Sequence, residues 1–214
     1  FEFFLEKNGK LDKLKPLIEL TERVRFFYTR QSAPLGNGHA LLCAREFLGN
    51  EPFAFSDGDS IIDAKRPGIG DLINVDKKKH APVIGVGHSD NPQTMTKYGN
   101  VHGRKVSERV YKVEKIIEKP ALKDISPHGL IVGGMRYVFT RDIWTFLQKQ
   151  KPGKGKEIWL ADAANALAKK KPFYAYEYDG VYLDTGDRLG LLKAALHFAM
   201  KDEDMRRDLS TLIH

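Results

Sequence analysis

The sequence predicts an α/β fold. Segments rich in β-branched and aromatic residues alternate along the chain with segments whose apolar residues recur at helical spacing, and this order is typical of α/β proteins. The 214 residues, 42% of them hydrophobic, are enough to bury a large core. No stretch rich in Pro, Gly or Ser interrupts the chain, so residues 1–214 are expected to form a single domain.

Helices are expected where apolar residues recur every three or four positions. Leu41 and Leu48, for example, share one face of a helix. The pair Asn8-Gly9 is typical of a helix end, and Asp187 can cap the helix that follows it. In chain order, the expected helices are 1–7, 11–22, 38–48, 70–79, 141–150, 158–169 and 187–200.

Strands are expected where β-branched and aromatic residues form short apolar runs. In chain order, the expected strands are 24–29, 53–56, 82–88, 110–118, 129–140, 173–179 and 181–183. The last two flank Asp179-Gly180, a pair that favours a tight turn, so they are expected to form a hairpin.

The charge and cysteine content exclude several classes of protein. Cys43 is the single cysteine, which excludes an intramolecular disulfide and favours a reducing, cytoplasmic location. Apolar runs such as 130–132 are too short to span a bilayer and no secretory signal is visible, so no membrane partner is expected. The net charge is +7, but the lysine runs 77–79 and 169–171 lack interleaved aromatics and any nucleic-acid-binding spacing. No nucleic-acid partner is therefore expected.

Histidines and tryptophans carry little functional signal. The seven histidines show no metal-ligand spacing, and no Gly-x-Ser-x-Gly elbow indicates a nucleophilic serine. Trp144 and Trp159 fall within helical patterns, so both are expected in the core rather than against a ligand.

A glycine-rich segment, 31–40, lies between an expected strand and an expected helix. Gly36 and Gly38 would let the backbone approach a flat ligand, and the start of the helix would offer N–H groups to an anion or a carbonyl. A plain glycine turn before a helix explains the segment equally well.

The triplet Asp57-Gly58-Asp59 follows the expected strand 53–56. Carboxylates at the carboxyl end of a buried strand lie where open α/β sheets bind ligands. Mg²⁺ is usually held by one or two carboxylates together with ligand phosphates. A metal–phosphate site is one interpretation of the triplet, and a polar turn is the other.

Two further motifs place charged residues at strand ends. Glu118 could accept hydrogen bonds from sugar hydroxyls and Lys119 could meet a phosphate, although a surface ion pair would have the same sequence. Asp184 is another carboxylate at an expected sheet edge, just before a tight turn at Gly186. Asp187 is better explained as a helix cap.

In this order, the motifs resemble the bacterial-type UTP–glucose-1-phosphate uridylyltransferases, or UDP-glucose pyrophosphorylases, over residues 1 to about 199. The ordered combination is far more specific than any single motif. Besides the four motifs, the resemblance is carried by the segments 4–9, 30–31, 36–44, 51–54, 98–99, 136–138, 142–144 and 157–163.

The resemblance implies a Rossmann-like mixed β-sheet flanked by helices, of the nucleotide-diphospho-sugar transferase type. It implies a reaction in which UTP and glucose 1-phosphate form UDP-glucose and pyrophosphate with Mg²⁺. Nucleotidyl transfer depends on positioning and charge neutralisation more than on a protein nucleophile, which agrees with the lack of a triad motif. Oligomers are common among such enzymes, so a homo-oligomer is expected.

The resemblance also implies roles in binding the nucleotide and the metal. Gln31 would read the edge of the uracil, and the backbone at Gly36 and Gly38 would cradle the base. Asp59 would hold the metal beside the phosphates, and Asp184 matches a second metal contact of related sugar-nucleotide transferases.

For the sugar phosphate, the implied residues lie in the middle of the chain. The backbone of Gly99 and the carboxylate of Glu118 would fix sugar hydroxyls, and Lys119 would pair with the phosphate. Asp59 and Lys119 are therefore the expected catalytic residues.

The chain departs from the family pattern at its start. The family begins with a glycine-rich loop of the type Gly-x-Gly-Thr-Arg and a Pro-Lys segment, which bind the triphosphate and supply basic catalytic residues, and neither occurs here. The expected fold is therefore N-terminally incomplete, and the chain is expected to be weakly active or inactive. Met135 falls where relatives often have Gly, and Arg188 replaces a common Lys while keeping its charge.

Other functions fit part of the sequence. A GT-A-type glycosyltransferase would use Asp57-Gly58-Asp59 as its metal motif, but it leaves Glu118-Lys119-Pro120 and Asp184 unexplained. A non-catalytic module that binds a sugar nucleotide would keep the base and sugar pockets. A relative that uses dTTP or another sugar phosphate also fits, because that choice depends on pocket shape.

Overall fold

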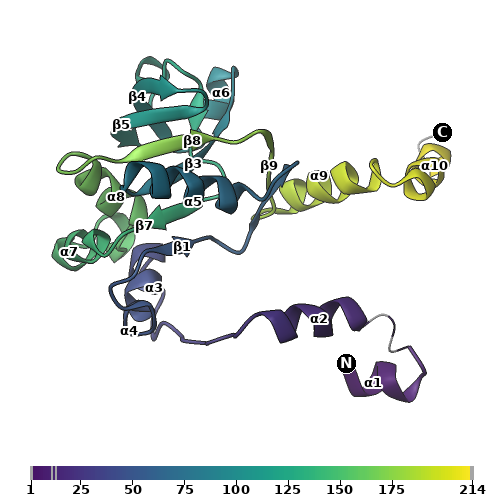
Figure 1. Cartoon of the computed structure of the whole chain (residues 1–214). Coiled ribbons are helices and arrows are strands. Elements are labelled where there is room, and N and C mark those ends of the chain that lie inside the picture. The colour runs from purple at the N-terminus through teal and green to yellow at the C-terminus, as the bar shows by residue number, and fades with distance from the viewer. Residues whose placement is uncertain (1, 11, 13, 213–214) are drawn as a thin grey trace. The chain divides into compact units, whose positions relative to one another are not determined.

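The structure is a computed structural model that describes residues 2–10, 12 and 14–212 (Figure 1). It divides into two units, Phe1–Ala33 and Pro34–His214. None of the helices in the described residues is long and apolar enough to cross a membrane.

The first unit contains α1 (Glu2–Lys7) and α2 (Lys15–Arg23). The expected end of the first helix is confirmed, because the Asn8 side chain donates to Phe4 O and Gly9 adopts a φ of +64°. The second helix begins later than the expected 11–22, with a proline in its first turn, where proline is tolerated. Residues 11 and 13 of that prediction lie outside the described residues.

The expected strand 24–29 is wrong, since the structure assigns no strand to these residues. Phe26 and Tyr28 stack on each other with ring centroids 6.3 Å apart, and both remain largely exposed. Aromatic and β-branched residues favour a strand only where a partner strand and a packing surface exist, and this segment has no strand pairing in the described structure.

The second unit is built on a mixed, seven-stranded sheet (Figure 1). Its strand order is β1-β7-β3-β6-β4-β5-β8, with β3 also parallel to β8 and the other pairs antiparallel. The elements of this unit are, in chain order, α3 (Asn37–Cys43), α4 (Arg45–Leu48), β1 (Phe53–Phe55), β2 (Ser60–Ala64), α5 (Gly68–Lys79), β3 (Val83–His88), α6 (Pro92–Met95), β4 (Asn100–Ser107), β5 (Val110–Ile117), the 3₁₀ turn η2 (Leu122–Asp124), β6 (Leu130–Ile131), β7 (Tyr137–Phe139), α7 (Asp142–Lys149), η3 (Lys154–Lys156), α8 (Leu160–Ala168), β8 (Tyr174–Glu177), β9 (Gly180–Asp184), α9 (Arg188–Ala199) and α10 (Glu203–Leu212).

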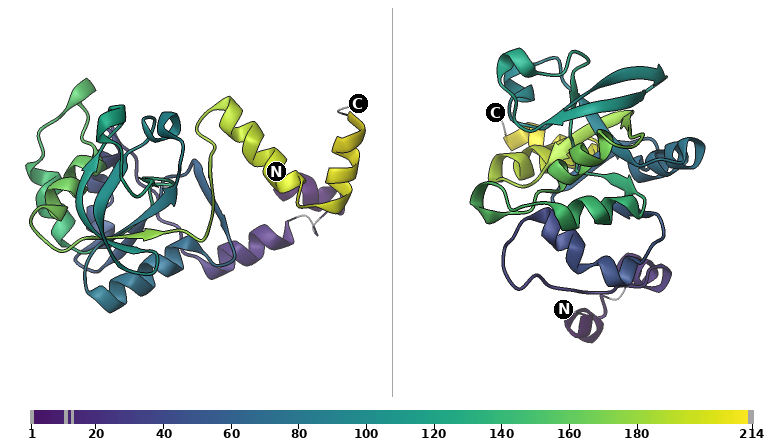
Figure 2. Two further views of the ribbon diagram at one scale, coloured as in Figure 1. Left: turned by 90° about the horizontal axis from the view of Figure 1, so that it is seen from above. Right: turned by 90° about the vertical axis from the view of Figure 1, so that its left-hand side faces the viewer.

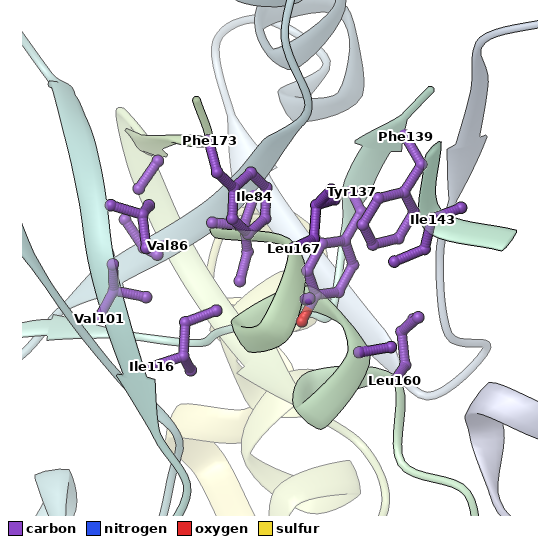
Figure 3. Close-up of a cluster of buried hydrophobic side chains, with 14 of the residues drawn as sticks. Ile84, Val86, Val101, Ile116, Tyr137, Phe139, Ile143, Leu160, Leu167 and Phe173 are labelled. Carbon is purple, nitrogen blue, oxygen red and sulfur yellow. The ribbon is translucent and has the colours of Figure 1, made fainter. Parts of the chain in front are cut away.

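Helices cover both faces of this sheet, which confirms the expected layered α/β architecture (Figure 2). Successive side chains of a strand point to opposite faces, and β3 follows this rule. Ile84 belongs to the larger core cluster, with buried residues of α7 and α8, whereas Val83 belongs to a second cluster with Leu72 and Val75 of α5. Figure 3 shows part of the larger cluster, in which Leu160, Leu167 and Ile143 lie against side chains of the sheet.

The expected hairpin of 173–179 with 181–183 is wrong. β8 pairs with β3 and β5, whereas β9 leaves this sheet and pairs antiparallel with β2. A side-chain carbon at Gly180 would lie 2.4 Å from Asp63 O, so the close approach of β2 explains this glycine better than a tight hairpin does.

Two other expected elements are interrupted. The expected strand 129–140 is divided into β6 and β7 by a loop in which Gly134 and Met135 have φ values of +72° and +26°. The expected helix 38–48 is divided into α3 and α4 at Ala44. Left-handed backbone ends a strand, and propensity alone does not reveal such breaks.

The β4–β5 hairpin is regular at one end and irregular at the other. Asn100 pairs with Ile117, Val101 with Ile116 and His102 with Lys115, and the register then shifts between His102 and Gly103 and again between Lys105 and Ser107. The first irregularity therefore lies near the middle of the hairpin and the second beside its turn.

We expect Gly85→Ala to lower the free energy of unfolding by about 3 kcal/mol, because overpacking a strand in the core forces neighbours to move. The added carbon would lie 1.6 Å from Tyr178 Oη and 2.2 Å from its Cζ. Urea unfolding measures the change. Gly70→Ala is the matched control: nothing lies within 4 Å of its added carbon, and alanine in α5 should stabilise by about 0.5–1 kcal/mol. Equal effects of the two substitutions would contradict the expectation.

Candidate active site

A cavity of about 260 Å³ in the second unit brings together five of the predicted site residues, which come from distant parts of the chain. Its lining consists of Asp57, Asp59, Ser60, Lys97, Tyr98, Gly99, Glu118, Lys119, Val132, Met135, Tyr137, Ala161, Tyr182 and Asp184. Among these are the predicted site residues Asp59, Gly99, Glu118, Lys119 and Asp184.

Pairing of β2 with β9 brings the two predicted metal-binding carboxylates together. Ser60 lies opposite Asp184 in the register, so Asp59 lies beside the residues that follow β9. Thr185 fixes this position, because its backbone N–H and its hydroxyl each donate to Asp59 O at 2.8 Å. The turn is closed by Gly186 N–H, which donates to Asp184 Oδ1 at 2.9 Å.

The carboxylates of Asp59 and Asp184 converge beside Gly186. A side-chain carbon at Gly186 would lie 3.0 Å from Asp59 Oδ2 and 3.2 Å from Asp184 Oδ1. Both carboxylate oxygens therefore lie close to Gly186, where a larger residue would crowd them. Oxygen donors of this kind are what Mg²⁺ prefers, with phosphates and water completing its shell. The described residues contain no group of three or more His, Cys, Asp or Glu placed to hold a metal.

Asp57 adds a third carboxyl group to this end of the cavity. Its Oδ1 atom is buried and has no hydrogen-bond partner among the described residues. Burial raises the pKa of Asp57, a hydrogen bond to Ser60 opposes the shift, and the nearby Asp59 charge adds to it. A buried acceptor beside two carboxylates is a setting in which a cation lowers the electrostatic free energy.

Pairing of β4 with β5 builds the other side of the cavity. Asn100 lies opposite Ile117, so Gly99 and Glu118 are neighbours just beyond the ends of their strands. A side-chain carbon at Gly99 would lie 2.8 Å from Glu118 Oε2, and glycine is therefore needed for the carboxylate to sit against the backbone. Desolvation raises the pKa of Glu118, Lys119 opposes this shift, and Asp162 adds to it.

Lys119 adopts a left-handed backbone conformation, with a φ of +44°. For a non-glycine residue this conformation costs roughly 1–3 kcal/mol, and such strain is concentrated at functional sites. Lys119 also lines an adjoining cavity of about 480 Å³, together with Glu118, Glu157, Trp159 and other residues. The position of Lys119 between two cavities fits a role in contacting a ligand that extends through both.

The two tryptophans differ in their surroundings. Trp144 is buried as expected, stacks on Phe53 with centroids 5.0 Å apart, and donates from its indole to Gly49 O. Trp159 was expected in the core, but it is 36% exposed and lines the larger cavity. Trp159 immediately precedes the first residue of α8, so it lies outside the helix whose apolar face is buried.

The structure gives Gly36 and Gly38 a packing role. Gly36 has a φ of +92°, and side-chain carbons at Gly36 and Gly38 would lie 2.6 Å and 2.8 Å from Ile158 O. Gly38 N–H donates to Ile158 O at 2.9 Å, and Asn37 Oδ1 accepts from Leu160 N–H. Contact with the backbone of 157–158 thus explains both glycines, and their role in binding a base stays a prediction.

Gln31 belongs to the first unit and is half-buried there. It is absent from the residues that line the described cavities of the second unit. Its role toward the uracil also stays a prediction.

Several residues of the cavity carried no assigned role in the sequence. Tyr98 Oη donates to Asp184 Oδ2 at 3.5 Å and its ring meets Tyr182 edge-on at 6.0 Å. Both tyrosines lie inside recognised motifs, and that position was the available signal. Lys97 and Tyr137 were harder to identify as site residues from the sequence. A lysine next to a motif is usually a surface residue, and a tyrosine within an apolar strand is usually a core residue.

Arg136 supports the site without lining it. Its guanidinium donates to Ser60 O and to Gly134 O, both at 2.9 Å, which ties the start of β2 to the loop before β7. Met135 lines the cavity and has a φ of +26°, at the position where the resemblance predicts glycine.

Comparison with known proteins gives a consistent result. The nucleotidyl transferase family model matches residues 4–201. The UTP–glucose-1-phosphate uridylyltransferase of Staphylococcus haemolyticus is 38% identical over 213 residues, which cover 99% of this chain and 73% of the relative. A second such enzyme, from Staphylococcus saprophyticus, is 38% identical over 212 residues, or 99% of this chain and 72% of the relative.

Solved structures agree with the sequence comparison. A UDP-glucose pyrophosphorylase complexed with UDP-glucose superposes with a TM-score of 0.83 at 31% identity, over 91% of this chain and 73% of that one. A UTP-bound UGPase from Acinetobacter baumannii also gives a TM-score of 0.83, at 29% identity over 99% and 73%. These relatives do not favour the glycosyltransferase alternative for Asp57-Gly58-Asp59. The chain belongs to the nucleotidyl transferase family, among the UTP–glucose-1-phosphate uridylyltransferases.

Proposed function

We propose that this chain binds UTP, glucose 1-phosphate and UDP-glucose at the cavity described above, and that its site serves the formation of UDP-glucose and pyrophosphate from the first two. The observation that carries the proposal is the meeting of Asp59, Gly99, Glu118, Lys119 and Asp184 in one cavity. Relatives with this activity in their names are 38% identical over nearly the whole chain.

In this proposal, Asp59 and Asp184 hold Mg²⁺ beside the phosphates. The convergence of their oxygens beside Gly186 and the unpartnered oxygen of Asp57 support this assignment. Bound Mg²⁺ offsets phosphate charge and orients the reacting groups.

The chain's own residues position the hexose phosphate. The backbone at Gly99 and the carboxylate of Glu118 fix the sugar hydroxyls, and the ammonium of Lys119 pairs with the phosphate. A phosphate oxygen of glucose 1-phosphate then attacks the α-phosphorus of UTP in line, the bond to the β-phosphate breaks, and pyrophosphate leaves. Alignment and charge neutralisation supply the rate, and no protein nucleophile takes part.

Gln31, Gly36 and Gly38 complete the proposal on the nucleotide side. Gln31 reads the uracil edge, and the backbone at the two glycines supports the base. The family match, which spans residues 4–201 and hence both units, supports treating the chain as one nucleotidyltransferase domain. The homo-oligomer and the cytoplasmic location stay predictions.

Calorimetric titration with UDP-glucose tests the metal-dependent site. In Mg²⁺ we expect Asp59→Ala to weaken binding roughly tenfold or more, because one of two protein ligands to the cation is lost. With EDTA in place of Mg²⁺, the affinities of the parent and the variant should converge. Asp124→Ala is the matched control, since this exposed carboxylate in η2 lies outside the lining of the cavity.

Binding that depends neither on Mg²⁺ nor on Asp59 would contradict the proposed site. Tight UDP-glucose binding without pyrophosphate exchange in a verified full-length chain would favour the non-catalytic binding module over the enzyme.

A second prediction concerns the pair Glu118 and Lys119. Because the Lys119 ammonium opposes a raised pKa at Glu118, Lys119→Met should raise the pKa of Glu118 further. Carboxyl ¹³C NMR titration measures this pKa, with Glu118→Gln identifying the resonance. Lys123→Met is the control, because Lys123 is not among the groups that shift Glu118. A Glu118 pKa that stays constant or falls in Lys119→Met would show that the ammonium does not act on this carboxylate.

A further inference from the structure

The hydroxyl group of Tyr137 is buried within the cavity wall and has no hydrogen-bond partner in the part of the chain that the structure describes. Tyr137 has an exposed fraction of 0%, and its Oη atom makes no hydrogen bond among the described residues. Nearly all buried polar atoms in native proteins are hydrogen-bonded, and an unpaired one destabilises the fold. Yet Tyr137 is part of the lining of the 260 Å³ cavity. A ligand in this cavity would supply the missing partner.

Packing holds the Tyr137 ring in place. Tyr137 lies opposite Phe55 of the edge strand β1 and Ile84 of β3. Its ring stacks on Phe139 with centroids 4.7 Å apart and an interplanar angle of 13°, and it also packs against Phe55 at 6.2 Å. Figure 3 shows the ring among buried apolar side chains, with the oxygen at its far end. The hydroxyl therefore cannot turn toward solvent to find a partner.

The surroundings of the hydroxyl favour a neutral ligand group. Burial raises the pKa of Tyr137, and the nearby carboxylate of Glu118 adds to the shift, so the phenol keeps its proton. Tyr178 and, to a smaller extent, Asp57 also raise the pKa of this group. The carboxyl groups of Glu118 and Asp57, which lie near this buried hydroxyl, would repel a phosphate. A sugar hydroxyl can instead accept a hydrogen bond from the phenol and donate one to a carboxylate.

We propose that Tyr137 Oη hydrogen-bonds one hydroxyl of the hexose and thereby helps to determine which sugars the site accepts. The inference rests on the proposed function and adds a specificity-determining residue to it. A site built to hydrogen-bond a substrate hydroxyl rejects the analogue that lacks it, because a buried group is then left unpaired.

Tyr137→Phe tests the inference, and Tyr178→Phe is its matched control. Tyr178 also has a buried hydroxyl without a partner among the described residues, but this hydroxyl faces Gly85 and Tyr178 is absent from the cavity lining. Both substitutions remove one oxygen from a buried ring. Urea unfolding should show neither variant to be less stable than the parent, since each loses an unpaired polar atom.

The measurement is calorimetric binding of UDP-glucose and of analogues that each lack one hexose hydroxyl, all in Mg²⁺. We expect the parent to bind one analogue about tenfold more weakly than UDP-glucose, a difference of about 1.4 kcal/mol. Tyr137→Phe should bind UDP-glucose about tenfold more weakly than the parent does and should no longer discriminate against that analogue. Tyr178→Phe should keep the affinity and the discrimination of the parent.

Unchanged affinity and discrimination in Tyr137→Phe would overturn the inference, and so would an equal loss of affinity for UDP-glucose and every analogue. Both results leave the proposed function standing, because the parent still binds UDP-glucose. A parent chain that does not bind UDP-glucose at all would instead overturn the proposed function and this inference with it.

Discussion

Backbone pairing between two pairs of strands assembles the candidate site. The β2–β9 register places Asp59 beside Asp184, and the β4–β5 register places Gly99 beside Glu118. A slip of one residue in either ladder would send these side chains to the opposite face of their strands. Main-chain hydrogen bonds between these strands therefore fix the positions of the cavity's side chains, although the bonds themselves contact no ligand. Arg136 reinforces one of these ladders through the carbonyl of Ser60.

The cavity concentrates features that oppose stability. Asp57, Asp59 and Asp184 bring like charges together, Lys119 has a left-handed backbone, and Tyr137 buries a hydroxyl that has no partner among the described residues. Each feature destabilises the empty fold, and each would be offset by a ligand: a cation for the carboxylates, a phosphate for the lysine and a hydroxyl for the tyrosine. Local conflict of this kind, within a sheet that is otherwise packed on both faces, distinguishes a binding site from a surface cleft.

Much of the fold could be predicted from the sequence wherever apolar periodicity was strong. Helices α5, α7 and α8 and strands β1, β3 and β5 follow the pattern closely, because each packs an apolar face into a core. The predictions of a strand at 24–29 and of a hairpin after 173 were wrong because strand propensity does not identify the partner strand. β2, β4 and α10 were not predicted, since β4 has a charged outer half and α10 is largely polar.

The charged residues of the site were easier to predict than the neutral ones. Asp59, Glu118, Lys119 and Asp184 lie where strands end, and the family resemblance joined them before any geometry was known. Tyr137 and Trp159 were harder to predict as cavity residues, because an aromatic residue in an apolar pattern is assigned to the core whether or not it also faces a cavity. Burial and the lack of a partner are properties of three-dimensional packing, and only the structure reveals them.

The irregular register of the β4–β5 hairpin has a consequence for local opening. One shift lies near the middle of the hairpin and the other beside its turn, whereas the pairs from Asn100–Ile117 to His102–Lys115 form an unbroken ladder. Fraying that begins at the turn meets a discontinuity before it reaches Gly99 and Glu118. Amide hydrogens should therefore exchange in two classes along one hairpin, fast near the turn and slowly beside the cavity. The hairpin can move at its tip while its base keeps Gly99 and Glu118 in place beside the cavity.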